Sequence, residues 1–390
     1  MNIYKNISWV IFTLFTFSSL NLSTTESFIP DPPSLNASSF ILIDASTNRV
    51  LAHKNANEKV EPASITKIMT AYVVSDQIKQ GFINLEDGVL ISENCWRKTG
   101  SRMFIREGDT VVLEDLIKGL VIASGNDASC AIAEYVAGSE ENFVDLMTRY
   151  SKKMELDNTN FINSSGWPDE NHFSSAADIA KISSFLIKDF PEHYSLYKEK
   201  WFTYGVKQPH RNRNTLLWQD DSIDGIKTGS TEAAGYCLVS SGIRNETRLI
   251  AVTMNSNSEK TRLTDNRRLL DYGFRYFRTK KLVSKEQNLE KVQVWGGKSE
   301  WLTLSPAKDF NLTLPSRDFK RIKPVVVLND YIQAPVLQGE VVGKMVFKLD
   351  ELEVGSVDLI SLEEINSQGF FRKTWSNIRL LVYRFLVEEN

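Results

Sequence analysis

The pattern of apolar and polar residues divides the chain into a long mixed region and a shorter strand-rich region. Apolar runs at 40–43 and 50–52 flank a polar turn at 46–48 and predict a β-hairpin with buried strands. Runs at 235–239 and 249–253 predict a second hairpin with its turn at 242–247. Apolar residues have helical spacing at 65–79, which Gly81 ends, and at 113–123, 128–137, 176–187 and 269–277. Because strands and helices do not alternate regularly, we expect an α+β fold with an antiparallel sheet flanked by helices.

The pattern changes beyond about residue 281 and predicts a small all-β domain. Its short strands are expected at 292–295, 302–304, 310–314, 325–328 and 341–349. The last segment, 370–387, places Phe371, Trp375, Ile378 and Val382 on one face and predicts a C-terminal amphipathic helix. Such a helix either lies on a membrane or packs on its own protein, and its tryptophan and arginines favour the membrane.

The N-terminus has the pattern of a secretory signal peptide. Lys5 precedes an apolar run at 7–17, and small polar residues lead to the proline-rich stretch 30–33. An uncleaved anchor helix is the alternative, but the run is short for a membrane span. We therefore expect four segments: a signal peptide at 1–27, a main domain at 28–280, a small β-sandwich-like domain at 281–368 and the amphipathic helix at 369–390.

Composition narrows the classes of function. The 390 residues carry a formal net charge of -3, which gives no electrostatic basis for binding nucleic acid. The four histidines lack metal-ligand spacing and no glycine-rich phosphate loop follows a predicted strand, so we expect neither a metal nor a cofactor. The three cysteines, Cys95, Cys130 and Cys237, are too scattered for a disulfide framework and are interpreted as incidental, with the last two in the core.

Three short motifs carry candidate chemistry: Ser64–Lys67, Ser124–Asn126 and Lys227–Gly229. Serine acyl transfer needs a hydroxyl, a base within hydrogen-bond reach and donors for the oxyanion, and residues three apart on a helix lie on one face. Each motif also occurs elsewhere by chance, at Ser195–Lys198, Ser305–Lys308, Ser34–Asn36, Ser92–Asn94 and Lys98–Gly100. The predicted secondary structure around each motif distinguishes the three candidates from these chance matches, because Ser64 opens a helix, Ser124 lies between two helices and Lys227 precedes a strand.

In this order the motifs resemble the penicillin-recognising serine enzymes. The stretches PASITKIMT at 62–70, ASGNDA at 123–128 and DGIKTG at 224–229 resemble the low-molecular-mass penicillin-binding proteins that are serine-type D-alanyl-D-alanine carboxypeptidases of peptidase family S11. The similarity covers nearly the entire chain. It implies a β-lactamase/transpeptidase-like main domain and an enzyme that β-lactam antibiotics acylate.

The resemblance also implies the substrate and the location. An enzyme of this kind removes the terminal D-alanine from peptidoglycan pentapeptide stems and thereby limits cross-linking. The terminal helix would hold the exported protein on the outer, periplasmic face of the cytoplasmic membrane as a peripheral protein.

Roles follow motif by motif from the resemblance. Ser64 would be the nucleophile, Lys67 its base and Ser124 a proton relay. Asn126 would bind the substrate amide, and Lys227 would keep the site electropositive and help to keep Lys67 neutral. The remaining substrate contacts are expected from Thr228, Gly229, Ser230, Arg213 and Arg262.

Three parts of the site differ from the family pattern or allow another interpretation. The backbone amides of Ser64 and Ser230 would form the oxyanion hole, although relatives often carry histidine where Ser230 stands. For Arg213 and Arg262, a solvated surface arginine is the alternative to a carboxylate contact. The segment 93–106 looks like a loop that influences deacylation in relatives.

Three alternative functions are open. A class A β-lactamase would carry Glu-x-x-Leu-Asn downstream of Ser124, and this pattern is absent from the sequence. A D,D-endopeptidase that cuts peptidoglycan crosslinks uses the same nucleophile, but such relatives usually end before a β domain. A wall-binding scaffold with a degenerate site is disfavoured because every motif side chain is intact, although fold alone does not guarantee activity.

Overall fold

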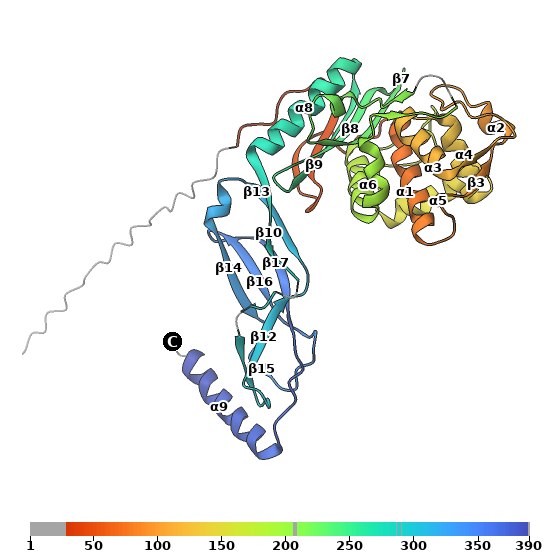
Figure 1. The fold of residues 1–390 in the computed structure, drawn as a ribbon. Helices are drawn as coiled ribbons and strands as arrows, with labels where there is room; N and C mark the ends of the chain where they lie inside the picture. The colour runs from red at the N-terminus through yellow and green to blue at the C-terminus, as the bar shows by residue number, and fades with distance from the viewer. Residues whose placement is uncertain (1–28, 206–208, 286, 290, 389–390) are drawn as a thin grey trace, which may run out of the picture.

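The computed structural model describes residues 29–205, 209–285, 287–289 and 291–388. The predicted signal peptide at 1–27 lies outside these residues. The described chain forms a larger α+β domain, a β-rich domain that extends from one end of it, and a final helix (Figure 1). The predicted fold class is confirmed.

The larger domain is built around an antiparallel five-stranded sheet in the order β2-β1-β9-β8-β7. Its strands are β1 (Ser39–Asp44), β2 (Val50–Lys54), β7 (Ile223–Thr231), β8 (Gly235–Arg244) and β9 (Thr247–Ser256). The first hairpin is confirmed. The predicted turn at 242–247 is too long, because β8 ends at Arg244 and β9 begins at Thr247. The turn consists of Asn245 and Glu246, and both have the positive φ that a two-residue hairpin turn requires.

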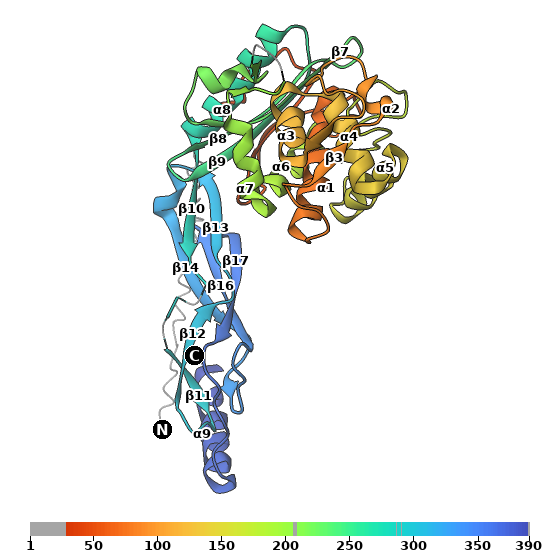
Figure 2. The same ribbon diagram turned by 45° about the vertical axis from the view of Figure 1, so that its right-hand side comes forward.

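Helices cover both faces of this sheet (Figure 2). Alternation along β1 directs Phe40 and Leu42 toward α8 (Glu259–Tyr276), whereas Ile41 and Ile43 face the core under α6 (Ala176–Asp189). The other helices of this domain are α1 (Lys67–Lys79), α2 (Glu93–Trp96), α3 (Leu113–Lys118), α4 (Asn126–Ala137), α5 (Glu140–Lys153) and α7 (Pro191–Tyr194).

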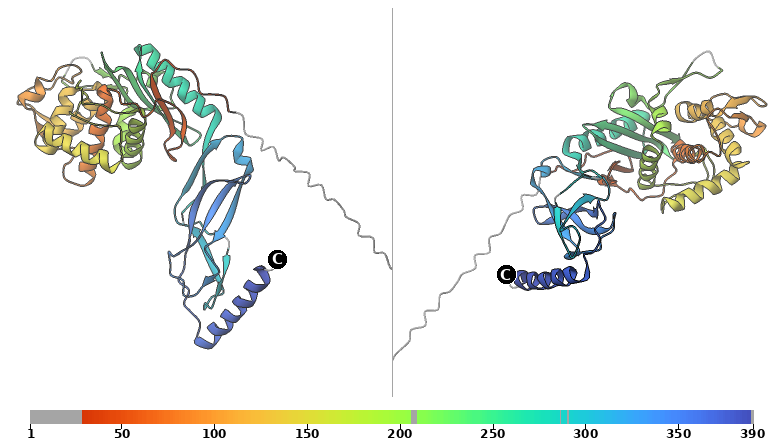
Figure 3. Two further views of the ribbon diagram at one scale, coloured as in Figure 1. Left: turned by 180° about the vertical axis from the view of Figure 1, so that it is seen from behind. Right: turned by 60° about the horizontal axis from the view of Figure 1, so that its bottom comes forward.

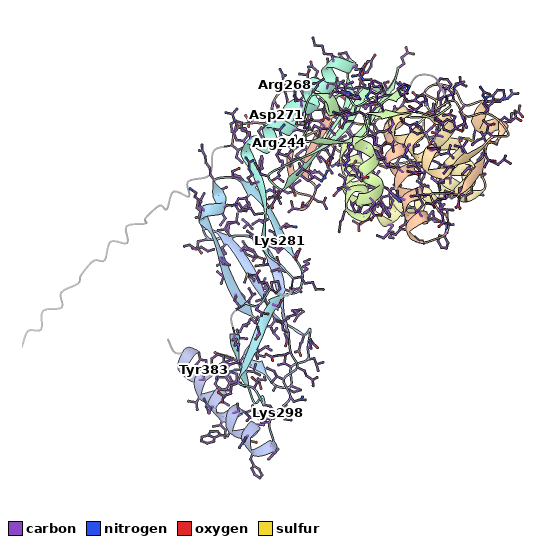
Figure 4. The ribbon with its side chains drawn as sticks, in the orientation of Figure 1. Arg244, Arg268, Asp271, Lys281, Lys298 and Tyr383 are labelled. Atoms are coloured by element: carbon purple, nitrogen blue, oxygen red, sulfur yellow. A yellow bond between two sulfur atoms is a disulfide. The ribbon has the colours of Figure 1, made fainter. Side chains whose placement is uncertain are left out.

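Helix α8 begins at Glu259, ten residues before the predicted start of the helix at 269–277. The hydroxyl of Ser258 caps it by accepting from the backbone N of Thr261 at 3.1 Å. Arg244 at the end of β8 pairs with Asp271 of α8 at 3.2 Å and ties helix to sheet (Figure 4). The first turns were missed because polar residues fill them and hide the apolar spacing.

Short elements complete the larger domain. Four are strands: β3 (Gly88–Leu90), β4 (Thr110–Val112), β5 (Trp201–Phe202) and β6 (His210–Arg211). Four are single helical turns: η1 (Ala63–Thr66), η2 (Gly119–Ala123), η3 (Ser195–Lys198) and η4 (Thr215–Trp218).

The C-terminal domain is all-β apart from one short turn, η5 (Asp318–Arg321). A six-stranded sheet runs β14-β16-β17-β12-β11-β15, and β10 pairs with β13. The strands are β10 (Phe277–Val283), β11 (Lys291–Trp295), β12 (Trp301–Pro306), β13 (Phe310–Pro315), β14 (Ile322–Leu328), β15 (Ile332–Gln333), β16 (Val341–Leu349) and β17 (Leu352–Ser361). All five predicted strands are present.

Hydrogen bonds around Thr313 join the two domains. The hydroxyl of Thr313 lies 2.7 Å from that of Thr47 and 3.0 Å from that of Thr279, and Arg49 Nη1 donates to its carbonyl oxygen at 2.7 Å. Asp44, at the end of β1, accepts from the Thr279 hydroxyl. The junction therefore contains specific contacts in addition to the peptide link.

The final helix, α9 (Phe370–Glu388), lies at the end of the C-terminal domain that is remote from the larger domain (Figure 3). Ser376 Oγ accepts from the backbone N of Gly296 at 2.8 Å, and Tyr383 packs against Trp295 with ring centroids 5.7 Å apart (Figure 4). The helix thus docks on its own protein through one face. Among the described residues, no helix combines the length and apolar composition that a membrane crossing requires.

Cys95 and Cys130 form a disulfide, which corrects the interpretation of these cysteines as incidental. The bond joins α2 to α4, with Cα atoms 5.3 Å apart. The two residues are 35 positions apart in the sequence, so only the fold brings them together. Cys237 is a free, buried thiol in β8, as expected of a small core residue.

Candidate active site

The three predicted motifs meet at one cavity of about 380 Å³ beside β7. Seven of the predicted site residues line this cavity: Ser64, Ser124, Arg213, Thr228, Gly229, Ser230 and Arg262. The other three predicted residues, Lys67, Asn126 and Lys227, are buried behind this lining and connected to it by hydrogen bonds. The structure therefore brings together every predicted site residue, although they are spread over 199 positions between Ser64 and Arg262.

Ser64 and Lys67 lie where η1 passes into α1, as the helical pattern predicted. Lys67 is 1% exposed, and its amine donates to Ser64 Oγ at 3.1 Å. It also donates to Asn126 Oδ1 and to the carbonyl oxygen of Ser165, both at 2.7 Å. The base candidate is thus held beside the nucleophile by two fixed acceptors.

Burial, with a smaller contribution from the positive charge of Arg213, lowers the pKa of Lys67 to about 7. The negative charges of Asp127 and Glu140 oppose this shift. At neutral pH a large fraction of Lys67 is therefore the neutral amine, which is the form that accepts a proton. Arg213 is the cation that acts on Lys67 most strongly in this arrangement.

Ser124 adopts a left-handed conformation, with φ of 60°, between the π-helical turn η2 and α4. Such backbone conformations in non-glycine residues concentrate at functional sites. The next residue but one, Asn126, is oriented by two carbonyl oxygens of the 93–106 segment. Its Nδ2 donates to Thr99 O at 2.7 Å and its backbone N donates to Ser101 O at 2.6 Å.

Lys227 lies within β7, not before a strand as the pattern indicated. Its Nζ donates to Ser124 Oγ at 2.8 Å and to Thr228 O at 3.1 Å. Burial, followed by the positive charges of Lys67, Arg213 and Arg262, lowers the pKa of Lys227 well below its ordinary value.

The backbone of β7 passes very close to the nucleophile at Gly229. A Cβ at this position would lie 3.1 Å from the backbone N of Ser64 and 2.9 Å from Pro62 O, so only glycine permits the approach. The following residue, Ser230, is exposed and lines the cavity. The strand therefore passes directly beside the backbone of the predicted nucleophile.

The two arginines differ in their surroundings. Arg262 of α8 is 5% exposed, so the alternative of a solvated surface residue is wrong for it. It donates to Gly229 O at 3.3 Å and to the carboxylate of Glu259 at 3.0 Å, and its guanidinium lies 5.6 Å from the Tyr236 ring centroid. Arg213 is exposed and lines the same cavity.

The 161–174 segment, which holds Lys67 through Ser165, was missed by sequence reasoning. Asn163 Oδ1 accepts from the backbone N of Ser165, Gly166 and Trp167 and so fixes the turn. Gly166 has φ of 79°, and a Cβ there would lie 1.8 Å from Ala63 O, beside the nucleophile. The short run of Asn, Ser and Gly was the signal that marked a tight turn here.

Other cavity residues were also missed, because they belong to no motif: Ser101, Arg211, Asn212, Thr215, Tyr236 and Glu259. The Lys98–Gly100 segment lies in the loop between α2 and β4 and not in a strand. Unlike Lys227–Gly229, it therefore does not border the main sheet. It nevertheless contributes to the site through Thr99. A hydroxyl, a neutral amine, backbone donors and a cationic wall together make up an acyl-transfer site for an anionic substrate.

Comparison with known families gives two matches along the chain. A profile described as D-alanyl-D-alanine carboxypeptidase matches residues 26–258. A second, described as the C-terminal domain of penicillin-binding protein 5, matches residues 277–367. Together they cover both folded domains except for residues 259–276, which form α8.

Individual relatives agree with the profiles. The chain is 38% identical over 364 residues to D-alanyl-D-alanine carboxypeptidase DacC of Escherichia coli, covering 91% of this chain and 90% of the relative. It is 39% identical over 375 residues to DacA of the same species, covering 94% and 92%. The crystal structure of penicillin binding protein 5 from Haemophilus influenzae superposes with a TM-score of 0.81 at 36% identity, covering 87% of this chain and all of that one.

Proposed function

The chain belongs to the D-alanyl-D-alanine carboxypeptidase family, and on this premise we propose that it releases the terminal D-alanine of peptidoglycan stem peptides through an acyl-enzyme on Ser64. The observation that carries the assignment of the nucleophile is the 3.1 Å contact between Lys67 Nζ and Ser64 Oγ, with the pKa of Lys67 lowered to about 7. Hydroxyl and neutral base are within reach of each other at neutral pH.

Acylation begins when neutral Lys67 takes the proton of the Ser64 hydroxyl. Ser64 Oγ then bonds to the carbonyl carbon of the penultimate D-alanine, and the carbonyl oxygen becomes an oxyanion. The backbone N–H groups of Ser64 and Ser230 would stabilise that oxyanion, which the close approach of Gly229 to the Ser64 amide supports.

The tetrahedral intermediate collapses by breaking the bond between the carbonyl carbon and the leaving nitrogen. Ser124, whose Oγ accepts from Lys227, would give its hydroxyl proton to that nitrogen as D-alanine departs, and the proton that Lys67 took from Ser64 would replace it. Arg213, Arg262 and Thr228 would bind the carboxylate of the leaving D-alanine, because they line the same cavity as Ser64. Asn126 would hold the amide of the acyl part.

Deacylation follows when water attacks the ester and restores the Ser64 hydroxyl, with the shortened stem released as a carboxylate. A β-lactam would acylate Ser64 in the same way. Its leaving nitrogen stays covalently attached after the ring opens, so it continues to occupy the site, and the adduct persists longer than the peptide acyl-enzyme. The similarity of this chain to penicillin-binding protein 5 supports this expectation.

Intact-mass analysis with penicillin tests the nucleophile. Wild type is expected to gain one penicillin mass, and Ser64→Ala is expected to gain none. Ser195→Ala is the matched control, because Ser195–Lys198 has the same spacing but lies in an exposed turn. An adduct on Ser64→Ala would contradict the assignment.

Release of D-alanine from a pentapeptide ending in D-Ala-D-Ala tests the substrate. The carboxypeptidase assignment expects free D-alanine from this peptide. If the protein instead cleaved a purified crosslinked dimer and released no D-alanine from the pentapeptide, its function would be that of a D,D-endopeptidase.

We propose that the chain comprises a signal peptide at 1–27, a catalytic domain from 28, a β domain that ends at 368 and an anchor at 369–390. The boundary expected at 280/281 falls within β10, which pairs with β13 of the β domain, so we place it at 276/277. The exposed face of α9 supports the anchor: Phe371, Trp375 and Ile378 are 87%, 65% and 51% exposed. Its opposite face docks on the β domain, so the alternative of packing on its own protein describes one face and leaves the exposed face for a membrane. The exported protein would then lie on the outer, periplasmic face of the cytoplasmic membrane.

Flotation with phospholipid vesicles tests the anchor. The mature protein is expected to float, and a variant that lacks residues 370–390 is expected to remain in the soluble fraction with full penicillin binding. Trp375→Ala with Phe371→Ala is the milder variant. Flotation of the truncated protein would locate the anchor elsewhere in the chain.

A further inference from the structure

Glu140 holds two separate segments at the rear of the active site with its two carboxylate oxygens. It is the first residue of α5, and its side chain is 15% exposed. Oε1 accepts from the backbone N of Ser164 at 3.1 Å and from its hydroxyl at 2.7 Å. Oε2 pairs with Lys98 Nζ at 2.8 Å. One side chain therefore joins the 161–174 segment to the 93–106 segment.

Each residue that Glu140 contacts is followed in the chain by a residue whose carbonyl oxygen accepts a hydrogen bond from a site residue. Ser164 precedes Ser165, whose carbonyl oxygen accepts from Lys67 at 2.7 Å. Lys98 precedes Thr99, whose carbonyl oxygen accepts from Asn126 Nδ2 at 2.7 Å. Displacement of Ser164 would move the adjacent Ser165 carbonyl, because Glu140 holds the backbone N of Ser164 and consecutive peptide units share one Cα. The contact with Lys98 is made by the end of its side chain and restrains the Thr99 carbonyl less directly.

We propose that Glu140 is a positioning residue for acylation: it fixes the separation of the Ser165 and Thr99 carbonyls, and through them the contact between Lys67 and Asn126. The inference rests on the roles proposed above for those two residues. Glu140 itself contacts neither the nucleophile nor the substrate-binding arginines in the structure. Its effect is exerted through the backbone of both segments.

A carboxylate is required at this position by the groups that face it. Burial raises the pKa of Glu140, but hydrogen bonds from Lys98 and Ser164 outweigh burial and lower the pKa below its ordinary value. The group therefore stays ionised at neutral pH. Its charge also acts on Lys67, where it opposes the lowering of the pKa by burial and Arg213. Loss of the carboxylate would leave the buried backbone N–H of Ser164 without its acceptor.

Two substitutions separate the geometry from the charge. Glu140→Ala removes the acceptor for both segments, and we expect the second-order rate constant of penicillin acylation to fall about 10- to 100-fold, as misplacement of catalytic groups does. Glu140→Gln keeps an oxygen for Ser164 but loses the charge, and we expect a smaller loss. In both, the rising limb of the pH profile is expected to move to lower pH, because a negative charge near Lys67 is gone.

Glu141→Gln is the matched control. Glu141 lies in the same first turn of α5 but is exposed, so its loss removes the same charge from the helix terminus. We expect the wild-type rate and pH profile for this variant. Lys98→Gln, in contrast, releases only the Thr99 side, and we expect a raised KM for peptide with the pH profile unchanged.

Stability is measured in parallel, since Glu140→Ala also weakens the fold. Thermal unfolding and titration of the acylatable fraction give the amount of folded protein in each sample. A wild-type rate and profile in Glu140→Ala would overturn the inference, and so would a loss explained wholly by the unfolded fraction together with an unshifted profile in Glu140→Gln. Penicillin labelling of Ser64→Ala would instead overturn the proposed function, so the two failures are distinguishable.

Discussion

The side-chain oxygen of Asn126 accepts a 2.7 Å hydrogen bond from the amine of Lys67, so the proposed base and the proposed amide-binding residue form one connected unit. The bond fixes the orientation of the Asn126 amide, because its nitrogen is directed at Thr99 O. An amide nitrogen has two hydrogens, so a second donor stays for the substrate. A change at either residue is expected to affect the other.

The pH dependence of acylation follows from the lowered pKa of Lys67. Lys67 acts as a base only when neutral, so acylation is expected to fall about tenfold for each pH unit below about pH 7 and to level off above it. Arg213→Ala removes a cation that lowers this pKa, and the rising limb is then expected to move to higher pH. The second-order rate constant of penicillin acylation is measured between about pH 5 and 9. A flat profile would contradict the role of Lys67.

Asn126→Asp is expected to impair acylation in a distinctive way. The new carboxylate would lie in the place of an oxygen that is 2.7 Å from Lys67, and an adjacent negative charge raises the pKa of an amine. The limb of the pH profile should therefore move to higher pH, opposite to the shift expected for Glu140→Gln. Asn126→Ala lacks the added charge and serves as the comparison, with a lower rate but no upward shift.

Gly229→Ala is expected to lower acylation by about 100-fold or more, the cost of losing one oxyanion donor. The added methyl group would lie 3.1 Å from the Ser64 amide and 2.9 Å from Pro62 O and would push β7 away from the nucleophile. Ser230→Ala tests the neighbouring position, where only the backbone amide is needed, and is expected to retain activity. Comparable losses in the two variants would argue against a backbone oxyanion hole.

Reduction of the Cys95–Cys130 disulfide is expected to destabilise the fold. A bridge closing a loop of this length, with a separation of 35 residues, contributes about 3–4 kcal/mol by limiting the unfolded chain. Thermal unfolding of the wild type with and without reductant measures this loss of stability. The unfolding temperature of Cys95→Ser should be lower than that of the oxidised wild type and should not change with reductant, because the bridge is already lost. Cys237→Ala keeps the bridge and should remain sensitive to reductant.

The sequence predicted the site better than it predicted the surroundings of the site. Ser64, Ser124 and Lys227 were distinguished from chance matches by order and by flanking helices and strands, which are local features. The disulfide and Glu140 were not predicted, because their partners are distant in sequence and their spacing fits no motif. Glu140 looks like any acidic residue in the first turn of a helix until the fold places Ser164 and Lys98 beside it.

Element boundaries failed for a related reason. The first turns of α8 carry polar residues, and its start was predicted ten residues too late at Leu269. The strand β10 was missed because its sequence, FRTKKLV, is mostly polar and is ordered by pairing with β13. In both cases contacts outside the element decide its conformation, and a local pattern does not contain them.

The bridge between Cys95 and Cys130 gives this enzyme a maturation step that depends on compartment. The cytosol keeps thiols reduced, so a newly made chain awaiting export carries two cysteines where the exported protein has a covalent link between α2 and α4. That link fastens the segment whose Thr99 and Ser101 carbonyls hold Asn126. If the protein is exported as proposed, assembly of the catalytic centre would be completed only after the chain has reached an oxidising compartment.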